Sequence, residues 1–441
     1  MHIVILGAGQ VGTFIASNLS REHDIVIIEK DADTAEKIRE THDVLIIQGD
    51  GDNPNVLRQA QIEKAQIMLA VSGNDKVNIM AATWAASVGV SKIIVRIRDT
   101  DYLEYPELIQ NSETLIVHPG RIISDKIISL IGSPFAWKTE KLAMGKIKML
   151  KLKVEENTPV EGKKLTELGP AKAWIFAAVS RDGKISIPTG ETRLMTGDYV
   201  YAIGVPSVLG KLKELFGVQE EQVRSTVIVG GGRLGRGVAK TLSERGIDVK
   251  LIENNPERAT LAASELNKVL VFRGDATDSD TLVEVGVESA DYFIALTGDD
   301  ENNVLSALLA KNLGARRTTV LYTKPDYIDV IEAIGVDRAI SVRLSVANEI
   351  LSMLHLGGIA QVALIDEGKA EVLEFDVKEK SDICGKALRD VHFPADCIVG
   401  IALRGEDVII PRGDYVAEDG DRIIIFTLPE AEKKVEKILS R

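Results

Sequence analysis

The sequence predicts an α/β protein with two Rossmann-like, doubly wound parallel-sheet domains, each followed by a small α+β domain. A glycine-rich nucleotide-binding fingerprint occurs twice, as HIVILGAGQVG at the N-terminus and as TVIVGGGRLG about half a chain later. Later landmarks repeat at an offset of about 225 residues: Glu29, Asp50 and Asn78 return as Glu253, Asp275 and Asn303. Strand-like apolar runs also alternate with helical periods, which is typical of a parallel sheet covered on both faces. One fingerprint alone is a weak signal, but two in register indicate a duplicated nucleotide-binding protein.

Length and composition fit a soluble protein of several domains. The chain has 441 residues, of which 45% are hydrophobic and 27% charged, and we expect three or four domains. The net charge of -13 argues against sequence-independent binding to nucleic acid or anionic lipid. We find no apolar run near the ~20 residues that cross a bilayer, and no signal peptide. The two cysteines and six histidines lack ligand spacing, so we expect no metal site.

The first domain is expected to alternate strands and helices over about 110 residues. Strands are predicted at His2–Leu6, Asp24–Glu29, Val44–Gln48, Gln66–Ala70, Lys92–Arg96 and Leu115–Val117. Helices are predicted at Val11–Leu19, Ala32–Thr41, Pro54–Gln59, Lys76–Ser87 and about Leu103–Ile109. Right-handed connections then leave a ligand crevice at the carboxyl edge of the sheet.

An amphipathic helix is predicted at Arg121–Trp137, with an apolar stripe of isoleucines. It could pack on its own domain, or it could be a swapped or dimer-forming helix. Short strands and tight turns follow, with a hairpin turn at Arg181-Asp182-Gly183-Lys184 and its equivalent at Gly405-Glu406-Asp407. Each small unit closes with an amphipathic helix, at Val208–Leu215 and at Glu430–Leu439.

These patterns give a pair of domains that occurs twice. The predicted boundaries are 1–120 for the first nucleotide-binding domain, 121–145 for a linking helix and 146–218 for the first small domain. The second copy is predicted at 224–345, 346–369 and 370–441 for the same three parts.

The glycine loops predict a phosphate-binding turn for backbone reasons. Gly7 permits the tight turn, Gly9 lets the main chain approach a pyrophosphate, and Gly12 lets the helix pack close to the sheet. The anion then lies on the unpaired N–H groups at the helix N-terminus. The candidate loop residues are Gly7, Ala8, Gly9, Gln10, Val11 and Gly12 in the first copy, and Gly230, Gly231, Gly232, Arg233, Leu234 and Gly235 in the second. Arg233 could add charge for a phosphate or could face solvent.

Glu29 and Glu253 each end the second strand of a copy, about 20 residues after the first glycine. A carboxylate at this place accepts hydrogen bonds from ribose hydroxyls and repels a 2′-phosphate. These residues therefore favour NAD(H) or an adenine nucleotide such as ATP/ADP over NADP(H).

Further candidates follow the next strands. Asp50 and Asp275 could approach the adenine or its ribose, although an N-cap of the next helix is an equally good account of either. Ser72-Gly73 and Thr297-Gly298 form small turns against which a nucleotide could lie. Arg96 ends the fifth strand and could pair with a phosphate. The corresponding segment VLYTK offers no arginine there, so we expect unequal sites.

Catalytic groups are not apparent in the sequence. No tyrosine has a lysine four residues on, no histidine lies beside an acid in a repeated position, and there is no G-x-S-x-G motif. The alternative function, an NAD-dependent oxidoreductase made from two fused dinucleotide-binding halves, would need an acid–base residue near the nicotinamide. The residues therefore offer no clear catalytic group, and the small β units look instead like sensory or dimerising modules.

Along essentially its whole length the chain resembles the TrkA family, the peripheral subunits of Trk potassium uptake systems. The resemblance is carried by GAGQVG, QGDG, VSGNDKVN and IVRIRD in the first half, and by IVGGGRLG, LIENN, RGDATD, ALTGDDENNVLSALLAKNLGA and VLYTKPDYIDVI in the second. Each half looks like one regulator-of-potassium-conductance (RCK) unit, in which a nucleotide-binding lobe precedes a small C-terminal lobe, RCK-C.

The resemblance implies a cytoplasmic regulator, peripheral to the inner face of the cell membrane. Members of the family assemble as homo-oligomeric rings beneath a Trk-type membrane potassium-translocating subunit, and nucleotide binding changes the ring and so the pore. The family's binding positions correspond to Gly7 to Val11, Glu29, Ser72-Gly73 and Arg96, and to Gly230 to Leu234, Glu253 and Thr297-Gly298. The QGDG and SGND segments depart from the RGDAT and TGDDE forms, which leaves the ligand of the first site open.

Overall fold

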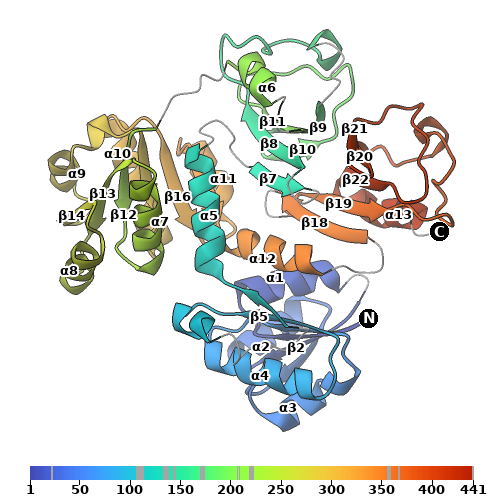
Figure 1. Ribbon diagram of the computed structural model, residues 1–441, viewed down its shortest axis with the longest axis horizontal. Helices are drawn as coiled ribbons and strands as arrows, with labels where there is room; N and C mark the ends of the chain where they lie inside the picture. The colour runs from blue at the N-terminus through green and yellow to red at the C-terminus, as the bar shows by residue number, and fades with distance from the viewer. Residues whose placement is uncertain are drawn as a thin grey trace. The chain divides into compact units, whose positions relative to one another are not determined.

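The computed structural model describes residues 1–20, 23–105, 114–132, 139–142, 146–168, 174–205, 207, 209–217, 223–354, 359–365 and 368–439. The chain forms two compact units. One unit contains Met1–Asp125, Leu321–Lys324 and Ile340–Ile350, and the other contains Lys126–Val320, Pro325–Ala339 and Leu351–Arg441. The two halves of the sequence repeat the same series of elements, which are labelled in Figure 1.

The first nucleotide-binding domain has a six-stranded parallel sheet in the order β3-β2-β1-β4-β5-β6. Its strands are β1 (His2–Leu6), β2 (Asp24–Glu29), β3 (Leu45–Gln48), β4 (Ile67–Ala70), β5 (Lys92–Arg96) and β6 (Thr114–Val117). Its helices are α1 (Gln10–Leu19), α2 (Ala32–Thr41), α3 (Pro54–Gln59) and α4 (Asp75–Ser87). The inner strands β1, β2, β4 and β5 are largely buried because helices cover both faces of the sheet. This is the predicted doubly wound fold.

One predicted helix of this domain is only partly confirmed. At about Leu103–Ile109 the described residues form a short 3-10 turn, Thr100–Glu104, and residues 106–113 lie outside the described ones. The turn begins where the side chain of Asp99 accepts the N–H of Asp101. The apolar spacing alone did not predict this local cap.

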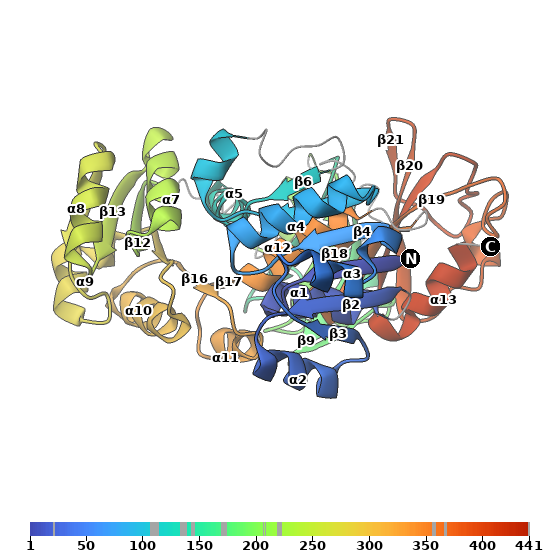
Figure 2. The same cartoon turned by 90° about the horizontal axis from the view of Figure 1, so that it is seen from below.

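The second nucleotide-binding domain repeats this topology in a sheet of order β14-β13-β12-β15-β16-β17. Its strands are β12 (Ser225–Val229), β13 (Asp248–Glu253), β14 (Val269–Arg273), β15 (Tyr292–Ala295), β16 (Thr318–Tyr322) and β17 (Arg338–Ser341). Its helices are α7 (Arg233–Glu244), α8 (Pro256–Glu265), α9 (Ser279–Val285), α10 (Asp300–Leu313) and α11 (Tyr327–Ala333). Right-handed connections place α7 and α8 on one face of the sheet and α9 and α10 on the other (Figure 2).

The linking helices are α5 (Pro119–Gly132) and α12 (Val342–Met353). The predicted helix Arg121–Trp137 therefore begins two residues earlier, and residues 133–138 lie outside the described ones. Residues Lys126 onward belong to the unit of the second nucleotide-binding domain, where Arg338 Nη1 donates to the carbonyl of Leu130 at 3.1 Å. From Lys126 onward, α5 therefore does not pack on the first nucleotide-binding domain, so that alternative is wrong for this part of the helix.

Helix α12 is exchanged in the opposite direction: it follows the second nucleotide-binding domain in the sequence, but most of it belongs to the unit of the first. Residues Ile340–Ile350 belong to the unit of the first nucleotide-binding domain, where the Arg343 guanidinium lies 4.6 Å from the centre of the Phe14 ring. Phe14 lies on α1, the helix that follows the first glycine loop.

Neither predicted linking segment is helical throughout. Within 121–145 and 346–369 lie the strands β7 (Thr139–Leu142) and β18 (Ile359–Ile365). These edge strands pair antiparallel with β8 (Ile147–Lys153) and β19 (Ala370–Asp376), which joins them to the small sheets.

The two small domains share one sheet topology, with orders β10-β9-β11-β8-β7 and β18-β19-β22-β20-β21. The other elements are β9 (Trp174–Arg181), β10 (Lys184–Ser186), β11 (Tyr199–Gly204) and α6 (Leu209–Leu215), and then β20 (Cys397–Arg404), β21 (Asp407–Ile409), β22 (Arg422–Thr427) and α13 (Pro429–Leu439). Both predicted hairpins are present. Asp182 and Gly183 have φ of 50° and 73°, the left-handed pair that a two-residue hairpin turn uses.

The small domains share one buried apolar cluster. Each also contains an arginine–aspartate ion pair at the same place. The cluster includes Tyr201 and Phe426, whose ring centres lie 6.1 Å apart. In each domain a buried aspartate accepts two hydrogen bonds from an arginine on the hairpin: Asp198 from Arg181, and Asp421 from Arg404. Among the described residues, no helix combines the length and the apolar character that a membrane span requires.

Candidate nucleotide-binding sites

The first and third glycines of each fingerprint have the geometry that a tight strand-to-helix turn demands. Gly7 and Gly230 have φ of +101° and +105°, in the region that other residues rarely adopt. A Cβ on Gly12 would lie 2.0 Å from the carbonyl oxygen of Gly7, and one on Gly235 would lie 1.8 Å from that of Gly230. These positions therefore fix the fold of the loop.

The middle glycines face open space. A Cβ on Gly9 or on Gly232 would meet no heavy atom within 4 Å. Each of these residues is the N-cap of its helix, with no side chain to satisfy the first N–H groups of α1 or α7. A phosphate group fits this cradle, because the loop leaves room for it beside the first N–H groups of the helix.

The remaining loop candidates lie around this cradle. Gln10 and Arg233 are exposed first residues of α1 and α7, and Val11 is buried in the first turn of α1. Leu234 is half-buried beside Arg233. Ala8 and Gly231, the second residues of the two loops, are buried, and their peptides are held by side chains from outside the loop.

The two glutamates bind the glycine loops directly. Oε2 of Glu29 accepts the N–H of Ala8 at 2.7 Å, and Oε2 of Glu253 accepts the N–H of Gly231 at 2.6 Å. The other oxygen of each accepts the N–H of a residue two positions on, Asp31 or Asn255. Each carboxylate is therefore held at the carboxyl end of its strand, where an adenosine ribose lies in this fold.

A buried asparagine shapes the turn after the fourth strand in each copy. Oδ1 of Asn78 accepts both the N–H and the hydroxyl of Ser72, and Oδ1 of Asn303 accepts the same two groups of Thr297. Both asparagines are fully buried. The sequence analysis noted their repetition and assigned them no role; the signal was the equal spacing from Ser72 and Thr297.

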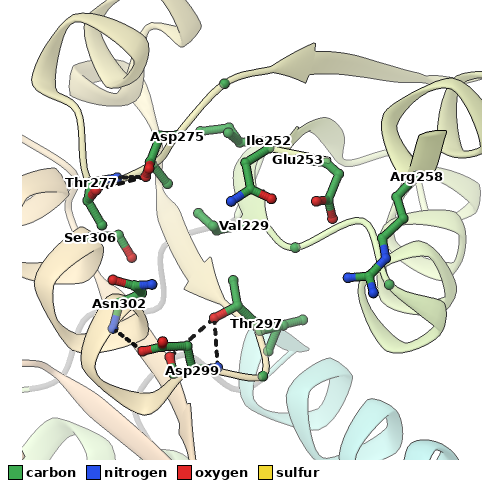
Figure 3. Close-up of a pocket in the computed structure, with 17 residues that line it drawn as sticks. Val229, Ile252, Glu253, Arg258, Asp275, Thr277, Thr297, Asp299, Asn302 and Ser306 are labelled. Carbon is green, nitrogen blue, oxygen red and sulfur yellow. Dashed lines mark hydrogen bonds between the residues drawn. The ribbon is translucent and has the colours of Figure 1, made fainter. Parts of the chain in front are cut away.

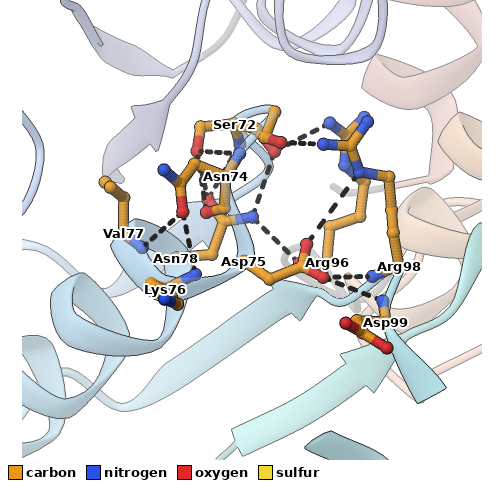
Figure 4. A network of polar contacts seen from close by, with 10 residues as sticks. Ser72, Asn74, Asp75, Lys76, Val77, Asn78, Arg96, Arg98 and Asp99 are labelled. Carbon is orange, nitrogen blue, oxygen red and sulfur yellow. Dashed lines mark hydrogen bonds and ion pairs between the residues drawn. The ribbon is translucent and has the colours of Figure 1, made fainter. Parts of the chain in front are cut away.

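Two arginines surround this turn in the first copy only (Figure 4). Arg96 Nη2 donates to the carbonyl of Ser72 at 2.7 Å, and Arg98 donates to the carbonyl of Gly73. Burial and the neighbouring Arg98 lower the pKa of Arg96 to about 10, so it is still a cation at neutral pH. Its Nε is buried and has no hydrogen-bond partner among the described residues.

The second copy lacks these cations. Strand register pairs Ala70 with Val95 and Ala295 with Val320, so Leu321 occupies the place of Arg96. The predicted inequality of the two sites is present in the structure at this position.

A cavity of about 200 Å³ marks the second site (Figure 3). Its lining joins the glycine loop, the end of β13, the turn after β14 and the start of α10. It includes the predicted residues Gly230, Gly232, Glu253, Asp275, Thr297 and Gly298. The structure thus brings together residues from all four parts of the predicted second site.

The two aspartates Asp50 and Asp275 are not N-caps of the next helices, so that alternative is wrong. Asn53 caps α3, and Asp278 caps α9. Asp50 instead forms an ion pair of 2.6 Å with Lys30. Asp275 accepts the N–H and the hydroxyl of Thr277, and these bonds lower its pKa.

The second cavity has polar lining residues that the sequence analysis did not single out. Arg258 lies on the first turn of α8, and Asn302 and Ser306 lie on α10. Their counterparts relative to the helix N-caps are Thr34, Val77 and Ala81 in the first copy. No sequence motif predicted these differences, because the packing of a helix on the sheet decides which of its side chains line the cavity.

The lining of the cavity offers carboxylates, amides, hydroxyls and one guanidinium, and these groups bind ribose, phosphate and base edges. Histidine, cysteine and tyrosine are not among the residues that line it. Among the described residues there is also no cluster of side chains able to hold a metal ion.

Comparisons with known proteins cover the whole chain. The family model described as the TrkA-N domain matches residues 3–117 and 226–342, and that described as the TrkA-C domain matches residues 149–217 and 372–440. A "Trk system potassium uptake protein TrkA homolog" of Archaeoglobus fulgidus is 37% identical, over 99% of this chain and 100% of the relative. The "Trk system potassium uptake protein TrkA" of Haemophilus influenzae is 34% identical, over 98% of each chain.

Solved structures share the fold at lower identity. The GsuK RCK domain has a TM-score of 0.61 and 21% identity, covering 99% of this chain and 94% of that chain. A GsuK channel bound to NAD also has a TM-score of 0.61 and 21% identity, covering 99% of this chain and 78% of that chain. These likenesses confirm the Rossmann-like and RCK architecture.

Proposed function

The chain belongs to the TrkA family, whose named members are potassium uptake proteins and not enzymes, and we propose that it senses NAD(H) or ATP/ADP and thereby gates a membrane potassium transporter. It is a regulatory component of potassium transport. The proposal adds the ligand, the membrane partner and the gating step. It also assigns the chain to the cytoplasmic face of the membrane.

The observation that carries the proposal is the pair of open phosphate cradles. Gly9 and Gly232 leave space beside the first N–H groups of α1 and α7, while Glu29 and Glu253 lie where ribose hydroxyls would bind. This donor set fits a nucleotide with a free ribose and a diphosphate. GsuK, which has the same fold, has been solved as a channel bound to NAD and bound to ADP, which supports the same ligand class here.

Nucleotide binding would act on the transporter through the exchanged helices. The first cradle lies at the N-terminus of α1, and α1 contacts α12 through Phe14 and Arg343. A ligand shifts such an arrangement only by its difference in affinity for two states. The two members of a pair, ATP and ADP or NADH and NAD, must therefore bind with different affinity or with different structural effect.

The partner is proposed to be a Trk-type potassium-translocating subunit, with this chain as a homo-oligomeric ring beneath it. The test has two parts on the full chain. Calorimetric titration with ATP, ADP, NAD and NADH should give saturable binding, and light scattering should give an oligomer. Absence of binding by all four nucleotides would contradict the proposal.

A further inference from the structure

The second residue of each glycine loop has both its N–H and its carbonyl held by side chains from outside the loop. In the first copy, the N–H of Ala8 donates to Glu29, and its carbonyl accepts the hydroxyl of Thr13 at 2.9 Å. In the second copy, the N–H of Gly231 donates to Glu253, and its carbonyl accepts Nη1 of Arg236 at 2.9 Å. The N–H belongs to the peptide before this residue and the carbonyl to the peptide after it, so each of these two peptides is held by one side chain.

Thr13 and Arg236 occupy the same position of their helices. The N–H of Thr13 donates to the carbonyl of Gly9, and that of Arg236 donates to the carbonyl of Gly232, each at 3.0 Å. A hydroxyl in the first copy and a guanidinium in the second therefore donate to equivalent carbonyls of the two loops. The threonine acts alone, as a neutral hydroxyl one turn into α1.

The arginine acts as part of an ion pair. Nε of Arg236 donates to Oε2 of Glu265 at 2.7 Å, and Glu265 is the last residue of α8. The side chain of Arg236 is 16% exposed, whereas that of Glu265 is 48% exposed. The second loop is consequently connected through Arg236 to the end of a neighbouring helix, and the first loop has no such connection through Thr13.

The carbonyl that Thr13 or Arg236 holds lies in the same planar peptide as the N–H of Gly9 or Gly232, so its orientation decides where that N–H points. Rotation of the Ala8–Gly9 or Gly231–Gly232 peptide would also turn the chain that leads into α1 or α7. The phosphate donors of the cradle would then leave the ligand position. We propose that Thr13 and Arg236 are positioning residues for phosphate binding, and that only the second site depends on an ion pair, with Glu265. This inference rests on the proposed nucleotide-binding function.

The inference can be tested in the second loop by replacing Arg236 with the residue type that the first copy has at this position, a threonine. In Arg236→Val the carbonyl of Gly231 loses its donor, and we expect nucleotide affinity at the second site to fall at least tenfold. In Arg236→Thr the loop gains the hydroxyl that the first copy uses, and we expect affinity within about threefold of the original. The dissociation constants would be measured by calorimetry on the full chain carrying Gly9→Ala, so that the second site is observed.

Four further variants separate the sites. Glu265→Gln should weaken the second site, while Glu257→Gln, which changes another exposed glutamate of α8, should leave it unchanged. In the first site, studied with Gly232→Ala, Thr13→Val should weaken binding and Thr13→Ser should preserve it. Thermal unfolding of each variant reports whether it folds.

The outcomes distinguish this inference from the proposed function. If the unaltered chain binds no nucleotide, the proposed function itself fails. If it binds and Arg236→Val binds equally well, only the positioning role is refuted. Equal losses in Arg236→Val and Arg236→Thr would show that the guanidinium attracts the ligand by charge, which also contradicts positioning.

Discussion

Alanine at the middle glycine of each loop should remove nucleotide binding without harming the fold. Gly9 has φ and ψ of -73° and -176°, and Gly232 has -65° and 178°, which is extended backbone that alanine adopts freely. No heavy atom of the protein lies within 4 Å of the added methyl group at either position. We therefore expect the free energy of unfolding of Gly9→Ala and Gly232→Ala to change by less than about 1 kcal/mol.

The effect on the ligand is much larger because the methyl group enters the space reserved for phosphate. Phosphate oxygens accept loop N–H groups at about 2.7–3.2 Å, so a methyl between them forces the phosphate outward. Loss of one charge-assisted hydrogen bond costs about 1.5–3 kcal/mol, which raises the dissociation constant roughly 10-fold to 100-fold.

The assay is calorimetric titration of each variant together with its thermal unfolding. Gly12→Ala and Gly235→Ala are matched controls, since their methyl groups would lie 2.0 Å and 1.8 Å from a carbonyl oxygen and should lower the unfolding temperature as well. Binding by Gly9→Ala with the original affinity would refute the assignment of this space to a phosphate.

Three other predictions concern single side chains. Glu253→Gln removes the charge that repels a 2′-phosphate, so the ratio of the dissociation constants for NADP and NAD should fall about tenfold in a direct comparison, and an unchanged ratio would contradict the ribose assignment. Burial alone would raise the pKa of Asp421, but hydrogen bonds, led by those from Arg404, lower it overall. The ionised Asp421 therefore stabilises the folded protein above about pH 4, and this contribution is lost as the pH falls further. Asp421→Asn should lower the free energy of unfolding at pH 7 by about 3 kcal/mol and flatten its fall in acid, and an unchanged acid slope would count against this account. Arg338→Met leaves the carbonyl of Leu130 without this donor and should cost about 1–3 kcal/mol, with faster amide exchange in α5; unchanged exchange would show that the contact does not hold the helix.

The backbone of the nucleotide-binding domains could be predicted because its signals are local. Strands β1, β2 and β5 have the predicted bounds, since apolar runs flanked by glycine and charge define buried parallel strands. The glycine loops were predictable for the same reason, because the first and third glycines of each fingerprint meet a steric demand of the turn itself.

The parts that the sequence did not predict depend on contacts between distant residues. Asn78 holds a turn six residues away, and only the fold shows that its amide lies under Ser72. The exchange of α5 depends on a buried arginine, Arg338, that lies 208 residues from its partner Leu130. The strand β7 was expected as helix because its residues gain their pairing only from β8.

The most direct test of the regulatory role is potassium flux into liposomes that contain the Trk-type membrane subunit and the full chain. Flux should change when ATP replaces ADP or NADH replaces NAD, and the double variant Gly9→Ala/Gly232→Ala should abolish that response while the complex still assembles. A flux that ignores all four nucleotides, or that responds equally in the double variant, would contradict the account.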